Sequence, residues 1–222
     1  MKGLFTTATD TNVGKTWVGS RLVAELKRLN VDVQARKPIE SGWPSSLPEN
    51  DTDAWKLANA MGQIDALPIV CPNRFTAALS PDRAAMLEDK EVTLKKLYQD
   101  CLNEVKESDF LYVEGAGGFY SPICSDGLNA DLAVSLDLPV LLVVEDRLGC
   151  INQTLLNVEA IARRGLKLTA IALNKPAQVE TDQNMDNFSD IQARVDCEII
   201  SFGFKQNSAE SINRLAQLVI KT

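Results

Sequence analysis

Short apolar runs along this chain alternate with amphipathic segments. Apolar runs of this length, bounded by turn residues, are typical of strands buried on both faces of a sheet. Strands are therefore expected at residues 3–6, 31–37, 110–113, 139–144, 168–173 and 197–200. Because a segment with the periodicity of a helix separates each run from the next, the strands should lie parallel.

The segments between the runs have apolar residues every three or four positions, which is the spacing of one helical face. Val18, Leu22 and Leu26 follow this pattern directly after the first strand. Further helices are expected over residues 52–61, from Pro81, over 93–106, from Leu148–Asn152 to Gly165, and at the C-terminus. Strands alternating with helices throughout predict one α/β domain over 1–222, with a mainly parallel sheet covered by helices on both faces in three layers.

The segment between the first strand and the first helix contains Gly14-Lys15-Thr16. A strand, a loop ending in Gly-Lys-Thr and a helix is the arrangement of the phosphate-binding loop of P-loop NTPases. Lys15 would pair with the outer phosphates, Thr16 would ligate Mg²⁺, and free N–H groups at the helix start would point at the anion. The strict motif has glycine where this chain has Thr9, so a chance Gly-Lys-Thr at an ordinary helix start stays open.

Two further candidates lie at the ends of expected strands, and a third lies at the start of an expected helix. Lys37 begins a polar turn, and ligands of open α/β sheets bind at the carboxyl ends of strands; a solvated turn is the alternative. Glu114 ends a buried strand and precedes glycines 115, 117 and 118. Because glycine suits a backbone pressed close to a ligand, we interpret Glu114 as a Mg²⁺ or water ligand rather than part of a plain turn. Asp53 lies in the first turn of a helix, where capping is the alternative role.

Composition limits the possible functions. The 23 basic and 30 acidic residues give a net charge of −7, which argues against a nucleic-acid partner. No apolar run is long enough to span a membrane and no secretory signal is apparent, so we expect a cytoplasmic protein with free thiols. The chain has no histidine. That excludes a Ser-His-Asp triad, a histidine base and most zinc sites.

Taken together, these stretches resemble the dethiobiotin synthetase family along nearly the whole chain. Thr9–Thr16 is similar to the family's phosphate loop, which spaces its glycine one residue wider than the general motif. Ala8 stands where the family has a leading glycine, and alanine fits there if its backbone has no positive φ. Lys37–Gly42 resembles the family's catalytic-lysine turn. Glu114–Gly118 resembles its strand-end acid with the glycine loop, and Leu148–Asn152 its substrate-carboxylate segment.

The resemblance implies the following roles. Catalysis falls to Lys37, Lys15 and Thr11. Nucleotide binding falls to Asn12, Val13, Gly14, Lys15, Thr16, Trp17, Asp53, Glu114, Gly115, Ala116, Gly117, Asn174 and Lys175. Substrate binding falls to Thr11, Lys37, Ser41, Gly118, Gly149, Cys150, Ile151 and Asn152, and Mg²⁺ binding to Thr16, Asp53 and Glu114.

The activity that the resemblance implies is ring closure of 7,8-diaminononanoate with CO₂ and ATP, assisted by Mg²⁺, to give dethiobiotin. It also implies a homodimer in which the partner subunit holds the substrate carboxylate through residues 149–152. Two other functions stay open. One is another P-loop ATPase or ligase of the partitioning or cobyrinate amidase-like class, and the other is a non-catalytic nucleotide sensor.

Overall fold

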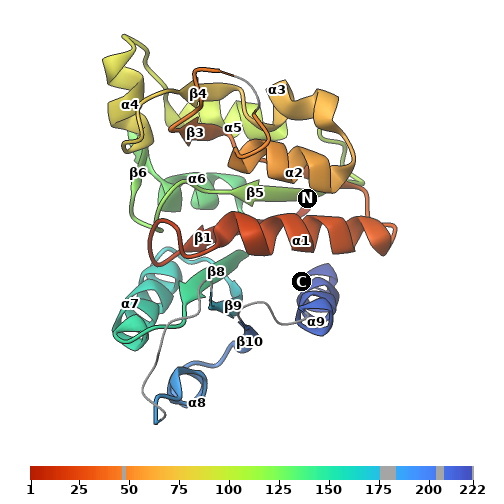
Figure 1. The fold of residues 1–222 in the computed structure, drawn as a ribbon, viewed down its shortest axis with the longest axis vertical. Coiled ribbons are helices and arrows are strands. Elements are labelled where there is room, and N and C mark those ends of the chain that lie inside the picture. Colours follow the sequence, from red (N-terminus) through yellow and green to blue (C-terminus); the bar gives the residue numbers. More distant parts are fainter. Residues whose placement is uncertain (47–48, 176–183, 204–207, 222) are drawn as a thin grey trace.

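A six-stranded parallel sheet forms the centre of the molecule (Figure 1). The computed structural model describes residues 1–46, 49–175, 184–203 and 208–221. Within them the strand order is β10-β9-β8-β1-β5-β2. The strands are β1 (Lys2–Ala8), β2 (Val33–Arg36), β5 (Phe110–Glu114), β8 (Val140–Glu145), β9 (Leu168–Asn174) and β10 (Glu198–Phe202). The expected parallel sheet is confirmed.

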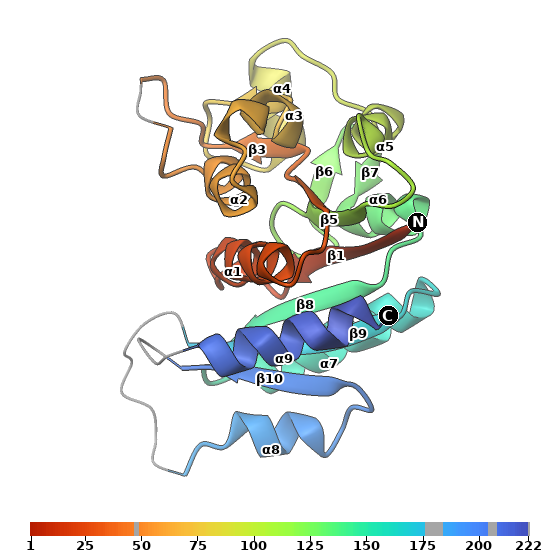
Figure 2. The same cartoon turned by 90° about the vertical axis from the view of Figure 1, so that its right-hand side faces the viewer.

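Helices cover both faces of this sheet, and each face has its own hydrophobic core. One core contains side chains of α1 (Lys15–Arg28), α2 (Asp53–Met61), α3 (Leu67–Val70) and α9 (Ala209–Ile220). The other contains side chains of α4 (Pro81–Leu87), α5 (Leu94–Leu102), α6 (Asn129–Leu136), α7 (Cys150–Arg163) and α8 (Asn187–Gln192). In Figure 2, α8 lies beyond β10 at one end of the sheet, and α2, α3 and α4 lie at the other. The three-layer prediction is confirmed, and the single domain over 1–222 stays a prediction.

Some short elements were not expected from the sequence. The segment expected as a polar turn contains β3 (Ile39–Ser41), which pairs in parallel with β4 (Asn73–Phe75). A small antiparallel pair, β6 (Pro122–Cys124) with β7 (Gly127–Leu128), follows the glycine loop. A short 3₁₀ helix, η1 (Ile64–Ala66), precedes α3. Strands this short leave little periodicity in a sequence.

Helix α5 ends at Leu102, earlier than the expected end near residue 106. Asn103 has left the helical conformation, with φ −58° and ψ 126°. The Asp109 carboxylate then accepts a hydrogen bond from the Lys106 backbone N–H at 2.9 Å. This local turn competes with a further helical turn, as aspartate side chains commonly do.

The carboxyl ends of the parallel strands meet at one edge of the sheet. Thr6 of β1 and Glu114 of β5 are register partners near that edge. Strands β5 and β2 lie on one side of β1, and β8, β9 and β10 lie on the other. The direction in which strands are added to the sheet therefore reverses beside β1. A crevice for ligands is expected at such a point. Ala8 is the last residue of β1 and is not among the residues with positive φ, so alanine is accommodated there.

Candidate functional site

The loop between β1 and α1 contains two residues with positive φ. Gly14, immediately before α1, is in the left-handed region with φ +101°. A Cβ at this position would lie 2.1 Å from Asn174 Nδ2, so only glycine fits without displacing that amide. Asn12 also has a positive φ, of 60°, which asparagine tolerates better than most residues. The loop is therefore held in a conformation that few other sequences could adopt.

Asn174 fixes this loop from the end of β9. Its side-chain Nδ2 donates a hydrogen bond to the Val13 carbonyl at 2.8 Å, and the residue is buried. The family resemblance implies a nucleotide-binding role for Asn174, and that role stays a prediction beside this contact with the loop. Lys175 follows directly, and its backbone N–H donates to the Phe202 carbonyl.

A buried lysine joins the two acidic residues that the sequence singled out. Lys37 Nζ lies 2.8 Å from Glu114 Oε1 and 3.3 Å from Asp53 Oδ2, and it also donates to the Gly115 carbonyl at 3.1 Å. The Thr16 hydroxyl donates to the same Glu114 oxygen at 2.6 Å. The structure therefore brings together Thr16 of α1, Lys37 directly after β2, Asp53 of α2 and Glu114 of β5. Their roles toward a ligand stay predictions.

These contacts change the proton affinities of the charged groups. Burial alone would lower the pKa of Lys37, but the adjacent carboxylates of Glu114 and Asp53 raise it above its ordinary value. Burial would raise the pKa of Asp53, but the Lys37 ammonium holds it below its usual range. Lys15, whose Nζ donates to the Asp10 carbonyl at 3.2 Å, has its pKa lowered to about 8 by burial and by the charge of Lys37.

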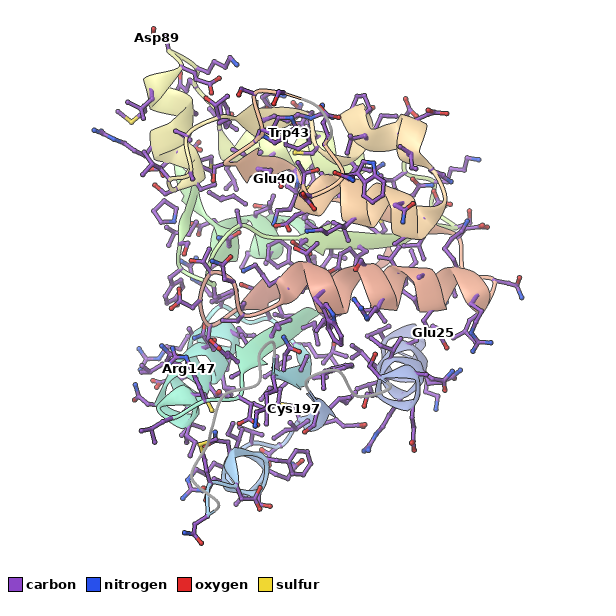
Figure 3. All side chains as sticks on the ribbon, in the orientation of Figure 1. Glu25, Glu40, Trp43, Asp89, Arg147 and Cys197 are labelled. Carbon is purple, nitrogen blue, oxygen red and sulfur yellow. The ribbon has the colours of Figure 1, made fainter. Side chains whose placement is uncertain are left out.

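Asp53 is not occupied with capping its own helix. Thr52 is the N-cap residue of α2, and its hydroxyl accepts the Trp55 N–H. Glu40 is a residue of β3, and its side chain reaches the start of α2 (Figure 3), where it accepts the N–H groups of Asp53 and Ala54 at 2.8 and 2.9 Å. Because two other side chains satisfy the orphan N–H groups of this helix end, the Asp53 carboxylate is available to Lys37. Sequence reasoning missed Glu40, although it lies inside the Lys37–Gly42 segment.

Asn129, also missed from the sequence, organises the glycine loop after β5. Its buried side chain accepts the Ala116 N–H and donates to the carbonyls of Ala116, Gly118 and Ser121. A Cβ at Gly115 would lie 2.5 Å from Asn129 Oδ1, and Gly117 has φ +78°. A Cβ at Gly118 would lie 3.4 Å from the Ala8 carbonyl, so the glycine loop passes close to the end of β1.

Other expected residues lie around this centre without joining it. Thr11 is exposed, with its backbone N–H and hydroxyl directed to Asp10. The Ser41 hydroxyl donates to the Leu79 carbonyl at 2.7 Å. Trp17 packs edge-on against Phe202 and lies under the Arg21 guanidinium. Their predicted ligand contacts stay predictions.

The segment Gly149–Asn152 starts helix α7 after β8, at the same edge of the sheet. Gly149 is the N-cap residue, with φ +89°, while Cys150 is buried. Arg147 marks the position of this segment in Figure 3. Within the described residues, no hydrogen bond or ion pair links Gly149–Asn152 to the Lys37 cluster. Leu148, just before it, is 86% exposed.

No helix in the described part of the chain is long and apolar enough to cross a membrane. The described residues also contain no group of three histidine, cysteine or acidic side chains arranged to hold a metal ion. A metal at this site would therefore depend on two carboxylates together with the Thr16 hydroxyl.

Comparison with known proteins identifies close relatives. A family model described as an AAA domain matches residues 2–201. The ATP-dependent dethiobiotin synthetase BioD of Anaeromyxobacter dehalogenans strain 2CP-1 is 41% identical over 175 residues, covering 79% of this chain and 77% of that protein. The protein of the same name from Ruthia magnifica is 33% identical over 226 residues, covering 99% of each chain.

Solved structures show the same fold at low identity. MinD in the MinC:MinD cell division complex of Aquifex aeolicus aligns with a TM-score of 0.57 and 15% identity, covering 99% of this chain and 93% of that one. The Pyrococcus furiosus cell division ATPase MinD aligns with a TM-score of 0.53 and 16% identity, covering 100% and 99%. These neighbours support a P-loop fold and say nothing of the substrate.

Proposed function

This chain belongs to the ATP-dependent dethiobiotin synthetase family and is an ATP-dependent ligase of biotin biosynthesis, and we propose that it closes the ring of dethiobiotin through a carbamate. In the proposed reaction, one amine of 7,8-diaminononanoate adds to CO₂ and gives the carbamate. A carbamate oxygen then attacks the γ-phosphate of ATP, which forms a carbamic-phosphoric anhydride and releases ADP. The second amine attacks the anhydride carbonyl, phosphate leaves, and the ring is closed.

The observation that best supports this proposal is the position of Lys37. It is buried at the carboxyl edge of the sheet, where Glu114 and Asp53 keep its ammonium charged. A lysine with a raised pKa is a poor general base and a good fixed positive charge. Lys37 and Lys15 would therefore neutralise negative charge that develops on the carbamate and the γ-phosphate. This suits a reaction that depends mainly on alignment and charge stabilisation.

Magnesium is part of the same proposal. The Thr16 hydroxyl and the carboxylates of Asp53 and Glu114 are oxygen donors, which Mg²⁺ prefers. Thr16 Oγ1 already lies 2.6 Å from Glu114 Oε1, and the Asp53 side chain is 39% exposed. These residues fit a magnesium ion that arrives with the nucleotide. When bound, Mg²⁺ would neutralise charge on the phosphates during phosphoryl transfer.

ADP release measured with and without diaminononanoate and bicarbonate tests the proposed activity. We expect release to depend on both compounds together. ATP hydrolysis that is indifferent to both would contradict the assignment and favour a partitioning-type ATPase. Nucleotide binding without any turnover under these conditions would favour a sensor.

Nucleotide affinity is expected to fall as the pH rises above about 8. Burial lowers the pKa of Lys15 to about 8, so its ammonium is present below that pH and is lost above it. If only the charged form binds phosphate, affinity should fall by up to about tenfold per pH unit. Bound phosphates should also raise the Lys15 pKa again, so binding should take up a proton. Isothermal titration in two buffers of different ionisation enthalpy measures both effects, and a flat affinity between about pH 7 and pH 9 would contradict the role of Lys15.

A homodimer with a shared site completes the proposal. Extended, a nine-carbon substrate spans on the order of 10 Å, so its carboxylate lies well away from its amines at Lys37. The start of α7 offers free N–H groups at Gly149–Asn152. Next to it, Leu148 and Leu156 are 86% and 58% exposed, as expected of side chains that a second copy of the chain covers. Cytoplasmic location, and the lack of nucleic-acid and membrane partners, stay predictions.

Mixing two inactive variants should restore activity. One chain has Lys37→Ala and the other has its Gly149–Asn152 segment replaced. Random pairing into C₂ dimers gives one intact composite site in half of them, so about a quarter of wild-type activity is expected. Activity is measured after subunit exchange has been confirmed with two differently tagged chains. If exchange occurs and activity does not recover, the carboxylate is held within a single chain.

A further inference from the structure

Three buried polar atoms near Glu114 make no hydrogen bond of normal geometry to a described residue, although the Tyr112 hydroxyl lies close enough to Thr6 and Glu114 to interact with both. They are Thr6 Oγ1, Tyr112 Oη and Glu114 Oε2, all on side chains with no solvent exposure. Thr6 and Glu114 are register partners on neighbouring strands. Tyr112 precedes Glu114 by two positions on β5, so their side chains lie on the same face of the sheet. The hydroxyls of Thr6 and Tyr112 therefore lie on the same face of the sheet as Glu114 Oε2, the carboxylate oxygen that does not contact Lys37.

Gly19 of α1 makes room for two of these atoms. A Cβ at Gly19 would lie 2.0 Å from Tyr112 Oη and 3.1 Å from Glu114 Oε2. Tyr112 Oη and Glu114 Oε2 therefore both lie beside Gly19. They are within reach of each other or of a single water that binds both. Glycine in the interior of a helix lowers the stability of the helix relative to alanine. At position 19 glycine is needed because the methyl group of an alanine would displace the Tyr112 hydroxyl.

We propose that Tyr112 is a positioning residue for Glu114, whose Oε2 it binds directly or through one water shared with Thr6. Buried polar groups are rarely left unpaired in native proteins, and a buried water typically satisfies about three of them. With Oε2 fixed by Tyr112, Oε1 faces Thr16 and Lys37. The inference rests on the proposed function, because it has a catalytic consequence only if Glu114 lies on the metal side of the nucleotide.

Replacing Tyr112 with phenylalanine tests this proposal, since the ring that fills the core is kept. ATP binding is measured by titration calorimetry without diaminononanoate, over a range of Mg²⁺ concentrations. Partners of metal ligands typically change metal affinity 10- to 100-fold, so we expect the half-saturating Mg²⁺ concentration to rise about tenfold. Affinity for ATP in excess EDTA should not change. Tyr98→Phe, a change at a more exposed tyrosine of α5, is the matched control.

Gly19→Ala tests the same contact from the helix. It should raise the Mg²⁺ requirement in the same way, because its methyl group would push Tyr112 and Glu114 apart. Adding Tyr112→Phe to Gly19→Ala removes the oxygen that lies closest to the new methyl group. The double variant should therefore need less extra Mg²⁺ than the product of the two single effects. A half-saturating Mg²⁺ concentration raised by the full product of the two single effects would contradict a shared contact.

An unchanged Mg²⁺ requirement in Tyr112→Phe, with a higher melting temperature, would overturn the proposal and identify the hydroxyl as a tolerated unpaired group. Glu114→Gln in the same titration separates the two possible failures. If it raises the Mg²⁺ requirement while Tyr112→Phe does not, the positioning role is wrong. If neither variant changes it, the metal-side role of Glu114 is wrong as well. Thr6→Val provides a second variant in case Tyr112→Phe folds poorly.

Discussion

Lys37→Ala should slow dethiobiotin formation roughly a hundred- to a thousandfold while nucleotide affinity changes little. Removing one group that stabilises charge in a transition state typically has an effect of this size. Lys37 is bonded to Glu114 and Asp53 rather than to the phosphate loop, so ground-state nucleotide binding should depend on it less. Single-turnover rates and calorimetric affinities for ATP measure the two effects separately.

Lys37→Ala leaves the buried Glu114 carboxylate without its partner, so a control must separate loss of stability from loss of catalysis. Breaking a buried ion pair from one side commonly destabilises a protein by about 3–5 kcal/mol. Lys37→Met keeps most of the side-chain volume, and a melting curve of each variant shows whether the fold is retained. Lys95→Ala, at an exposed position of α5, should leave the rate unchanged. Near-normal turnover in folded Lys37→Ala would contradict a catalytic role for Lys37 and leave it only the role of balancing the charge of Glu114 and Asp53.

Glu114→Gln and Asp53→Asn should each raise the Mg²⁺ concentration needed for half-maximal turnover by at least about tenfold, the lower end of the effect seen when groups around a metal are lost. Both changes keep the side-chain size and remove the negative charge. Glu114→Gln should have the larger effect, because Glu114 is fully buried and contacts both Thr16 and Lys37, whereas Asp53 is partly exposed. The measurement is the rate of ADP release as a function of free Mg²⁺.

Glu145→Gln is a matched control for these acidic positions. Glu145 ends β8 as Glu114 ends β5, but it pairs with Arg147 at 3.3 Å and is not part of the Lys37 cluster. It should leave the Mg²⁺ dependence unchanged. If the Glu114 and Asp53 variants also leave it unchanged, Glu114 serves only to balance the charge of Lys37, and Asp53 only favours the start of α2.

The sequence predicted the parts of the site that follow strand ends. Lys37 and Glu114 are predicted because a polar residue after a buried apolar run is unusual, and parallel strands bring such residues to one edge. Asp53 lies in the first turn of a helix, and its metal-side role is implied only by the family resemblance. The contacts of Lys37 with Glu114 and of Thr16 with Glu114 agree with that expectation. The positions that bind substrate and nucleotide stay predictions.

Residues that support the site could not be found in this way. Glu40 and Asn129 act through hydrogen bonds to backbone N–H groups 13 positions along the chain, and no local pattern marks that pairing. Nothing in the sequence around Gly19 marks its contact with Tyr112. Such roles depend on the tertiary approach of two elements, which periodicity does not describe. Short strands such as β3 were missed for a related reason, since three residues are too few to show alternation.

The hydrogen bond from Asn174 to Val13 joins two residues that the ribosome adds to the chain at widely separated times. When Val13 leaves the exit tunnel, the strand that ends in Asn174 has not yet been synthesised, and 161 positions separate the two. Domains fold during synthesis largely in the order in which they emerge. The hydrogen bond that fixes the first loop can therefore form only after the end of β9 has been synthesised. A nascent chain that stops before β9 would contain the whole Gly-Lys-Thr motif and lack the amide that fixes it.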